Sequence, residues 1–96
     1  MKSVKIYDKA GNQLNHFNNL LNCSIDNFRD ENALFKIEYV DHLIKITNSE
    51  NQYCFYDKNK KYIINEMNEY GISKVIMELD DVENEIVEKL IEKNEK

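Results

Sequence analysis

The chain has 96 residues, of which 42% are hydrophobic and 32% are charged, and its formal net charge at pH 7 is −5. This length predicts a single compact domain, residues 1–96, with a modest core. No apolar run is long enough to span a membrane. The N-terminus lacks the apolar core of a signal peptide, so we expect a cytoplasmic protein. Two cysteines and two glycines exclude a disulfide framework and a glycine-rich phosphate loop.

The N-terminal third contains one strand, one turn and a stretch that is hard to interpret. Residues 3–7 predict a short strand, because apolar and polar side chains alternate there. Residues 8–12 predict a turn, because Asp, Gly and Asn occur within five positions. The beginning of residues 13–32 fits either a second strand that returns beside the first or a short helix. The asparagines of this stretch disfavour a helix, because their side chains compete for the backbone hydrogen bonds. Ile25 and Phe28 predict that this stretch packs against the core.

Residues 34–57 predict the central element, a three-stranded antiparallel meander. Apolar and polar side chains alternate on both sides of Asp41-His42, which is the pattern of half-buried strands. A two-residue turn at Asp41-His42 pairs Glu38 with Lys45, a favourable cross-strand charge pair. The same register brings the apolar side chains of both strands to one face.

The second turn of the meander is predicted at Asn48–Asn51, a cluster of turn-forming residues. A two-residue loop there places Tyr53 and Phe55 on the apolar face and leaves Cys54 and Tyr56 on the other. The expected apolar face consists of Phe35, Ile37, Tyr39, Ile44, Ile46, Tyr53 and Phe55.

Residues 59–70 predict a helix, because their apolar side chains recur at a 3.6-residue period and Gly71 follows as a C-terminal cap. The lysines at 58, 60 and 61 disagree with this, since cations are unfavourable at a helix N-terminus. The alternative is a hairpin that turns at 57–60, with Tyr62–Ile64 as a fourth strand and a shorter helix after it.

The C-terminal quarter predicts a strand at 73–79 followed by an amphipathic helix. Asp80 and Glu83 have the spacing of an N-terminal capping box. Favourable i,i+4 charge pairs are expected between Glu85 and Lys89 and between Glu92 and Lys96. The expected buried stripe consists of Val82, Ile86, Val87, Leu90 and Ile91. The predicted fold class is therefore α+β: an antiparallel sheet built on the meander, then helix, strand and C-terminal helix.

Residues that could support catalysis or bind a metal are few. Cys54 with His16 could form a nucleophile–base pair, whereas the expected register places His42 at the far end of the hairpin from Lys45, the residue paired with Cys54. Two space-filling thiols and two surface histidines explain these residues more simply. The sequence has no short-spaced cysteine or histidine cluster of the kind that binds zinc. We therefore expect a non-enzymatic protein with no cofactor and no metal.

One stretch has the composition of a single-strand nucleic-acid binder. Tyr56 lies close to Lys58, Lys60 and Lys61, and such binders combine base-stacking aromatics with phosphate-binding lysines. The simpler interpretation is that the tyrosine packs in the sheet and the lysines keep a turn hydrated. Direct nucleic-acid binding is the weaker hypothesis, because residues 1–77 are neutral and the chain shows no basic face.

The whole negative charge lies in residues 78–96, which contain eight acids and three lysines. Such a surface could meet a basic groove on another protein and accelerate encounter, although a solvated amphipathic helix explains the same charges. The candidate partner-binding residues are Glu78, Asp81, Glu85, Glu88 and Glu92.

The leading hypothesis is therefore a small intracellular regulator or inhibitor that binds another protein. Asn, Lys and Ile make up 37 of the 96 residues, and their AT-rich codons favour a low-GC bacterium, or a phage or mobile element of one, as the source. Phage anti-defence proteins, including anti-CRISPR proteins, have this general character, but no motif supports the likeness. The alternatives are the nucleic-acid binder and a subunit of a larger assembly such as a virion.

Overall fold

The computed structural model describes residues 4–14, 25–69 and 71–95. This part of the chain forms six strands, a short 3₁₀ helix and one α-helix. In chain order the elements are β1 Val4–Asp8, η1 Asp26–Arg29, β2 Lys36–Val40, β3 Leu43–Thr47, β4 Tyr53–Asp57, β5 Tyr62–Glu69, β6 Ile72–Glu78 and α1 Asp81–Asn94.

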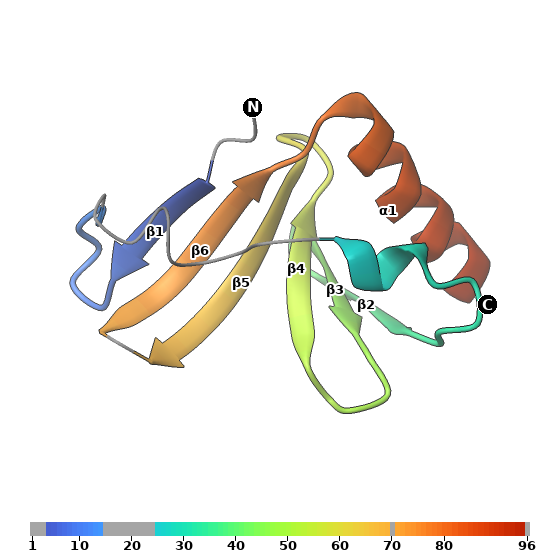
Figure 1. The fold of residues 1–96 in the computed structure, drawn as a ribbon, viewed down its shortest axis with the longest axis horizontal. Helices are drawn as coiled ribbons and strands as arrows, with labels where there is room; N and C mark the ends of the chain where they lie inside the picture. Colours follow the sequence, from blue (N-terminus) through green and yellow to red (C-terminus); the bar gives the residue numbers. More distant parts are fainter. Residues whose placement is uncertain (1–3, 15–24, 70, 96) are drawn as a thin grey trace.

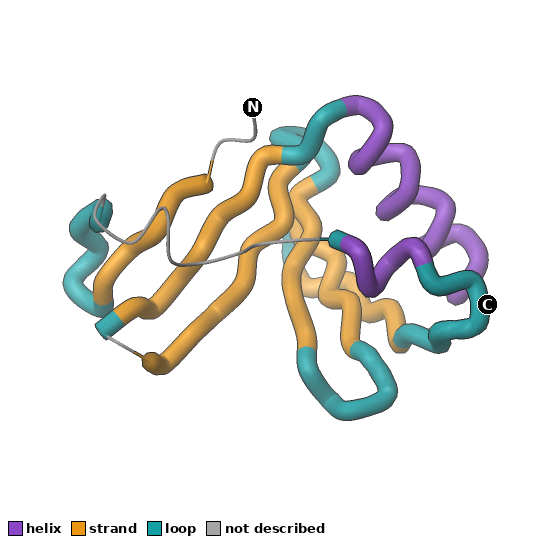
Figure 2. Tube along the Cα trace, viewed as in Figure 1, coloured by secondary structure: helices purple, strands orange, loops and turns teal. Residues whose placement is uncertain are grey.

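The strands form one antiparallel sheet with the order β1-β6-β5-β4-β3-β2. Strands β2 to β6 follow one another as a continuous meander, and the N-terminal β1 pairs with β6 at the far edge (Figure 1). The two helical segments contact each other and lie toward the β2 end of the sheet (Figure 2). The fold is thus α+β with an antiparallel sheet and a C-terminal helix, as the sequence predicts at this coarse level.

The first hairpin has the predicted register. Glu38 lies opposite Lys45, with Asp41 and His42 as a two-residue turn. Asp41 has φ of 55°, and the primed turns of two-residue hairpins have a positive φ at the first central residue. Aspartate tolerates this conformation better than most residues, so the tight turn forms without glycine.

The second hairpin differs from the prediction by one residue, which reverses the faces of β4. Cys54 lies opposite Ile46 and Tyr56 opposite Ile44, so Cys54 and Tyr56 face the core. The loop is longer than expected because Asn51 adopts φ of 65° and extends the turn, as in three-residue hairpin loops. Since side chains alternate along a strand, one added loop residue exchanges the two faces.

The predicted helix at 59–70 is wrong, because residues 62–69 form β5 between β4 and β6. The alternative hairpin is correct for Tyr62–Ile64, but the strand continues to Glu69 and no shorter helix follows. The Asp57 carboxylate accepts hydrogen bonds from the backbone N–H groups of Asn59 and Lys60, which stabilises a turn rather than a helical start. Gly71, with φ of 73°, serves the β5–β6 turn instead of a helix cap.

The C-terminal strand and helix are confirmed, with a shifted buried face. The side chain of Asp80 accepts from the N–H of Glu83, and the Glu83 side chain accepts from the N–H of Asp80, so the predicted capping box forms. Val82, however, is 64% exposed, whereas Glu83 and Asn84 are buried. The first turn is oriented by the capping box and by a polar contact of Asn84 described below, so Val82 does not join the buried stripe.

The main core lies between one face of the sheet and the helical segments. Val87, Leu90 and Ile91 of α1 pack with Ile25 and with the inward side chains of four strands. These strand residues are Ile46, Cys54, Tyr56, Ile63 and Met77, with Leu79 just beyond β6. A second cluster of Ile6, Ile72 and Val75 lies toward β1. Phe28 packs against the main core, as the sequence predicts.

The N-terminal strand and turn are also as predicted. The carboxylate of Asp8 accepts hydrogen bonds from the backbone N–H groups of Ala10 and Asn12, which closes the turn after β1. Leu14 then donates its backbone N–H to Ile6, so the chain returns beside β1. Predictions for 15–24, and the expected Glu92–Lys96 pair, lie outside the described residues. Within the described chain, no helix is long and apolar enough to cross a membrane.

Candidate binding surface on α1 and its flanking pockets

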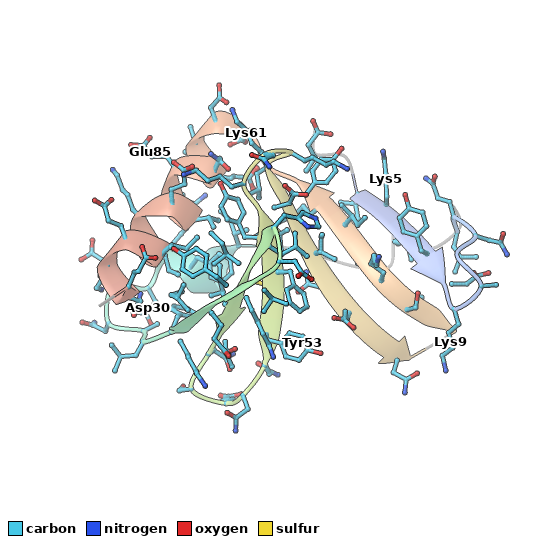
Figure 3. The ribbon with its side chains drawn as sticks, turned by 180° about the vertical axis from the view of Figure 1, so that it is seen from behind. Lys5, Lys9, Asp30, Tyr53, Lys61 and Glu85 are labelled. Carbon is cyan, nitrogen blue, oxygen red and sulfur yellow. The ribbon has the colours of Figure 1, made fainter. Side chains whose placement is uncertain are left out.

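The outer face of α1 carries a continuous row of carboxylates. Asp81, Glu85, Glu88 and Glu92 are spaced by four, three and four residues, which places them in one stripe of an α-helix. All four are exposed, and so is Glu78 at the end of β6. Figure 3 shows Glu85 on the side of α1 that points away from the sheet. The structure therefore places four of the five predicted partner-binding residues in one row on α1, which we call the acidic face. Glu78 follows the core-facing Met77 in β6, so strand alternation places it on the opposite face of the sheet.

Two lysines partly neutralise this acidic face near the start of the helix. Lys89 lies 3.1 Å from Glu85 as the predicted i,i+4 pair, and Lys61 from the β4–β5 loop lies 3.2 Å from Asp81. Both pairs are exposed, so each contributes at most about 1 kcal/mol. Of the described cations, none lies within ion-pair distance of Glu88 or Glu92. Among the described residues, the acidic-face carboxylates without an ion-pair partner are thus Glu88 and Glu92, in the C-terminal half of the helix.

A pocket of about 310 Å³ lies beside that half of the helix, between α1 and strands β2, β3 and β4. We call it the acidic pocket. It is lined by Tyr39, Ile44, Tyr56, Lys58, Glu88, Ile91, Glu92 and Glu95. Three carboxylates and two tyrosine rings therefore meet at one place, together with a single lysine.

Tyr56 forms the inner wall of the acidic pocket. Its side chain is fully buried, and its hydroxyl donates to Oδ1 of Asn84 at 2.5 Å. Oε1 of Glu88 lies 3.4 Å from the same hydroxyl oxygen. Burial, followed by the negative charge of Glu88, raises the pKa of Tyr56 to about 12.

Tyr39 forms the outer wall. It is 61% exposed, and its hydroxyl donates to the carboxylate of Glu95. This hydrogen bond to a carboxylate raises the pKa of Tyr39 above its ordinary value. The hydroxyl groups of both tyrosines therefore lie in a region of excess negative charge.

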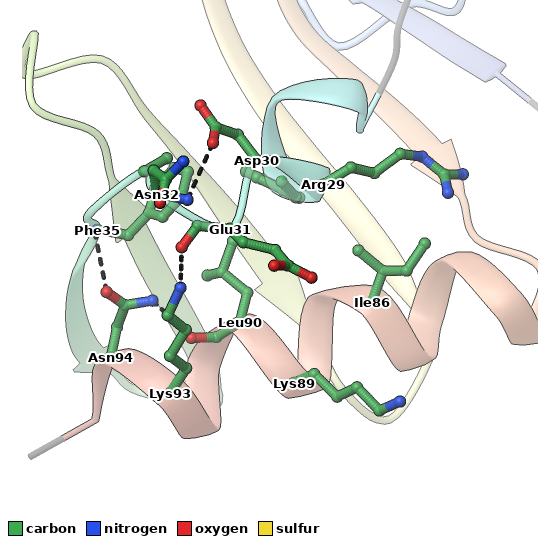
Figure 4. Close-up of a pocket in the computed structure, with 12 residues that line it drawn as sticks. Arg29, Asp30, Glu31, Asn32, Phe35, Ile86, Lys89, Leu90, Lys93 and Asn94 are labelled. Atoms are coloured by element: carbon green, nitrogen blue, oxygen red, sulfur yellow. Dashed lines mark hydrogen bonds between the residues drawn. The ribbon is translucent and has the colours of Figure 1, made fainter.

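A larger pocket of about 650 Å³ lies on the other flank of α1, against η1 and the loop that follows it (Figure 4). Phe28 and Phe35, whose rings meet edge to face at 5.6 Å, contribute to its apolar lining. The amine of Lys93 donates to the carbonyl oxygen of Glu31. The Asn94 side chain accepts from the N–H of Phe35 and donates to the carbonyl oxygen of Leu90. These polar groups hold the loop against α1 instead of pointing into the cavity.

Of the residues in the nucleic-acid hypothesis, only Tyr56 and Lys58 line a common pocket, the acidic pocket. The ring of Tyr56 is fully buried, so it presents no face on which a base could stack. Lys58, Lys60 and Lys61 are exposed in the β4–β5 loop, and Lys61 binds Asp81 of the helix.

Other aromatic side chains lie on the sheet face opposite the core. Tyr53, 43% exposed, meets Phe55 edge to face at 5.6 Å, and the amine of Lys45 lies 4.4 Å from the centre of the Tyr53 ring. Glu38 and Glu66 lie opposite Lys45 and Lys74 in the strand pairing. The charges on this face are therefore mixed in sign.

The candidate nucleophile Cys54 is buried in the core. Burial raises the pKa of its thiol to about 12, so the thiol is protonated at neutral pH and is a poor nucleophile. His42 is exposed in the β2–β3 turn, and His16 lies outside the described residues. The described side chains contain no group of three or more His, Cys, Asp or Glu arranged to hold a metal ion.

Tyr39 and Glu95 were not predicted as site residues. Their contact joins β2 to the end of α1 across 56 positions of sequence, and no local pattern reports such a distance. No protein-family model, curated protein or solved structure matches this chain.

Proposed function

We propose that this protein acts by binding another protein, as a regulator or inhibitor, and that the acidic face of α1 is its contact surface. The observation that carries the proposal is the exposed row of Asp81, Glu85, Glu88 and Glu92 on a single helix face. A helix presents such a row at fixed spacing, which suits a complementary row of basic side chains.

The expected partner has a basic groove, such as a surface that binds nucleic acid. Opposite potentials accelerate encounter between two proteins and exclude partners of like charge. Because the charges are exposed, the association rate should fall as ionic strength rises. A protein of this kind could compete with nucleic acid for the groove, which is one route to inhibition.

The test is charge reversal. Glu85, Glu88 and Glu92 are replaced by lysine, and tagged wild-type and variant proteins are used to capture partners from a low-GC bacterial lysate. In the matched control, Glu31, Glu50 and Glu66, which are also exposed, are replaced by lysine. The control therefore has the same change in net charge, but elsewhere on the surface. Circular dichroism establishes that both variants keep the fold.

We expect the acidic-face variant to lose the captured partner and the control to retain it. Capture of the same protein by the wild type and the acidic-face variant, in equal amounts, would refute the proposal. Equal loss in both variants would show that only overall charge matters, which would also contradict a specific contact surface.

A further inference from the structure

The acidic pocket has the size and position of a receptor for one side chain. Its volume is about 310 Å³, at the lower end of the range for ligand sites. It opens beside Glu88 and Glu92, which also belong to the acidic face. A side chain projecting from a partner that lies along this face could therefore enter the pocket without a change in the docked position.

The charge of the pocket favours a cation. Glu88, Glu92 and Glu95 contribute three negative charges and Lys58 one positive charge. The pocket also lies along the last turns of α1, where the helix dipole places partial negative charge. The carboxylates and the helix dipole thus both favour a positively charged ligand in this pocket.

The ring of Tyr39 favours a planar cation. Tyr39 offers an exposed ring at the pocket wall, and cations are attracted to aromatic faces. A guanidinium group can stack on such a ring while it donates paired hydrogen bonds to carboxylates, whereas an ammonium group is a compact and strongly hydrated point charge. Arginine suits this combination of groups better than lysine.

We propose that the acidic pocket binds a protruding arginine side chain of the partner, held between Tyr39 and the carboxylates of Glu88 and Glu92. This inference rests on the proposed function and deepens it, since it adds a specific anchor to a general charge attraction. Lys58, which lines the same pocket, acts against the incoming arginine by its like charge.

The probe is a tetra-arginine peptide, titrated into the full-length protein at low salt by isothermal calorimetry, with tetra-citrulline and tetra-lysine peptides as neutral and ammonium comparisons. The matched variants are Glu92→Gln inside the pocket and Glu85→Gln outside it, each of which removes one negative charge. We expect Glu92→Gln to raise the Kd for tetra-arginine about five- to tenfold and Glu85→Gln to raise it less than about twofold.

Three further variants separate anchoring from general attraction. Tyr39→Leu removes the ring and should weaken binding more than Tyr39→Phe, which keeps the ring and loses only the hydrogen bond to Glu95. Lys58→Gln should bind more tightly. Thermal unfolding checks that each variant is folded.

The inference is overturned by equal effects of Glu85→Gln and Glu92→Gln, by no effect of Tyr39→Leu, or by equal affinity for tetra-lysine. Those outcomes exclude the pocket as an arginine receptor and leave the proposed function to be decided by the lysate capture. Absence of any tetra-arginine binding also overturns the proposal that the pocket binds arginine. The lysate capture then tests the proposed function separately.

Discussion

Tyr56→Phe tests the core of the structure most directly. The Tyr56 ring is fully buried, and its hydroxyl donates to Asn84, which is also buried. Phenylalanine keeps the ring and removes only the hydroxyl, so the side-chain oxygen of Asn84 loses its partner inside the protein. Leaving a buried acceptor unsatisfied costs about 1–3 kcal/mol, out of a total stability of about 5–15 kcal/mol for a domain.

The assay is urea denaturation followed by circular dichroism. We expect the midpoint to fall while the slope with urea stays the same, which indicates a change in stability rather than in the surface exposed on unfolding. Tyr53→Phe is the matched control, because Tyr53 is 43% exposed, and it should change stability by less than about 0.5 kcal/mol. A larger loss for Tyr53→Phe than for Tyr56→Phe would refute the observed register of β4 and favour the one expected from sequence.

The cause of the loss can be isolated with a double-mutant cycle. Asn84→Ala and the Tyr56→Phe, Asn84→Ala double variant should show a coupling energy of about 0.5 kcal/mol or more, as groups in direct contact do. Additive effects would mean that the hydrogen bond between the two side chains contributes nothing measurable.

Two further predictions concern the hairpin of β3 and β4. Burial raises the pKa of Cys54 to about 12 from an ordinary 9.0, so its contribution to stability is complete below about pH 9 and is lost as the pH rises toward 12, by up to about 1.4 kcal/mol per pH unit. Urea titrations from pH 9 to 10.5 should therefore show a shallower decline for Cys54→Ala, and an unchanged slope would contradict a buried thiol. Asn51 has φ of 65°, a conformation that glycine adopts freely and alanine does not. Asn51→Ala should therefore lower the free energy of unfolding by about 1 kcal/mol, whereas Asn51→Gly should leave it nearly unchanged. Equal stabilities of the alanine and glycine variants would argue against this turn.

The predictions that succeeded rest on local patterns that agree with one another. In the first hairpin, strict alternation and the Glu38–Lys45 pair specify the same register. The start of α1 is specified by Asp80 and Glu83 alone, because a capping box joins residues three apart. The charge imbalance of residues 78–96 likewise follows from sequence, since a helix of known phase displays its own acidic row.

The predictions that failed needed information from elsewhere in the chain. Residues 62–69 can satisfy a helical period, but β4 and β6 lie on either side of them and offer backbone hydrogen bonds along both edges. The loop at 48–52 can have two or three residues between the paired positions. The longer loop is the one that brings Tyr56 to Asn84. One residue of loop length then decides which aromatic side chains are buried.

The sequence by itself determined an α+β protein with a central antiparallel hairpin, a capped C-terminal helix and a concentrated acidic end, because each depends on neighbours within a few positions. Only the tertiary structure decided that 62–69 is a strand and not part of a helix, that Tyr56 rather than Tyr53 enters the core, and that Tyr39 meets Glu95 across the acidic pocket. The physical reason is the same in each case. Strand pairing, burial and pocket formation are determined by contacts between distant segments, and their energies exceed the small local preferences that a sequence pattern records.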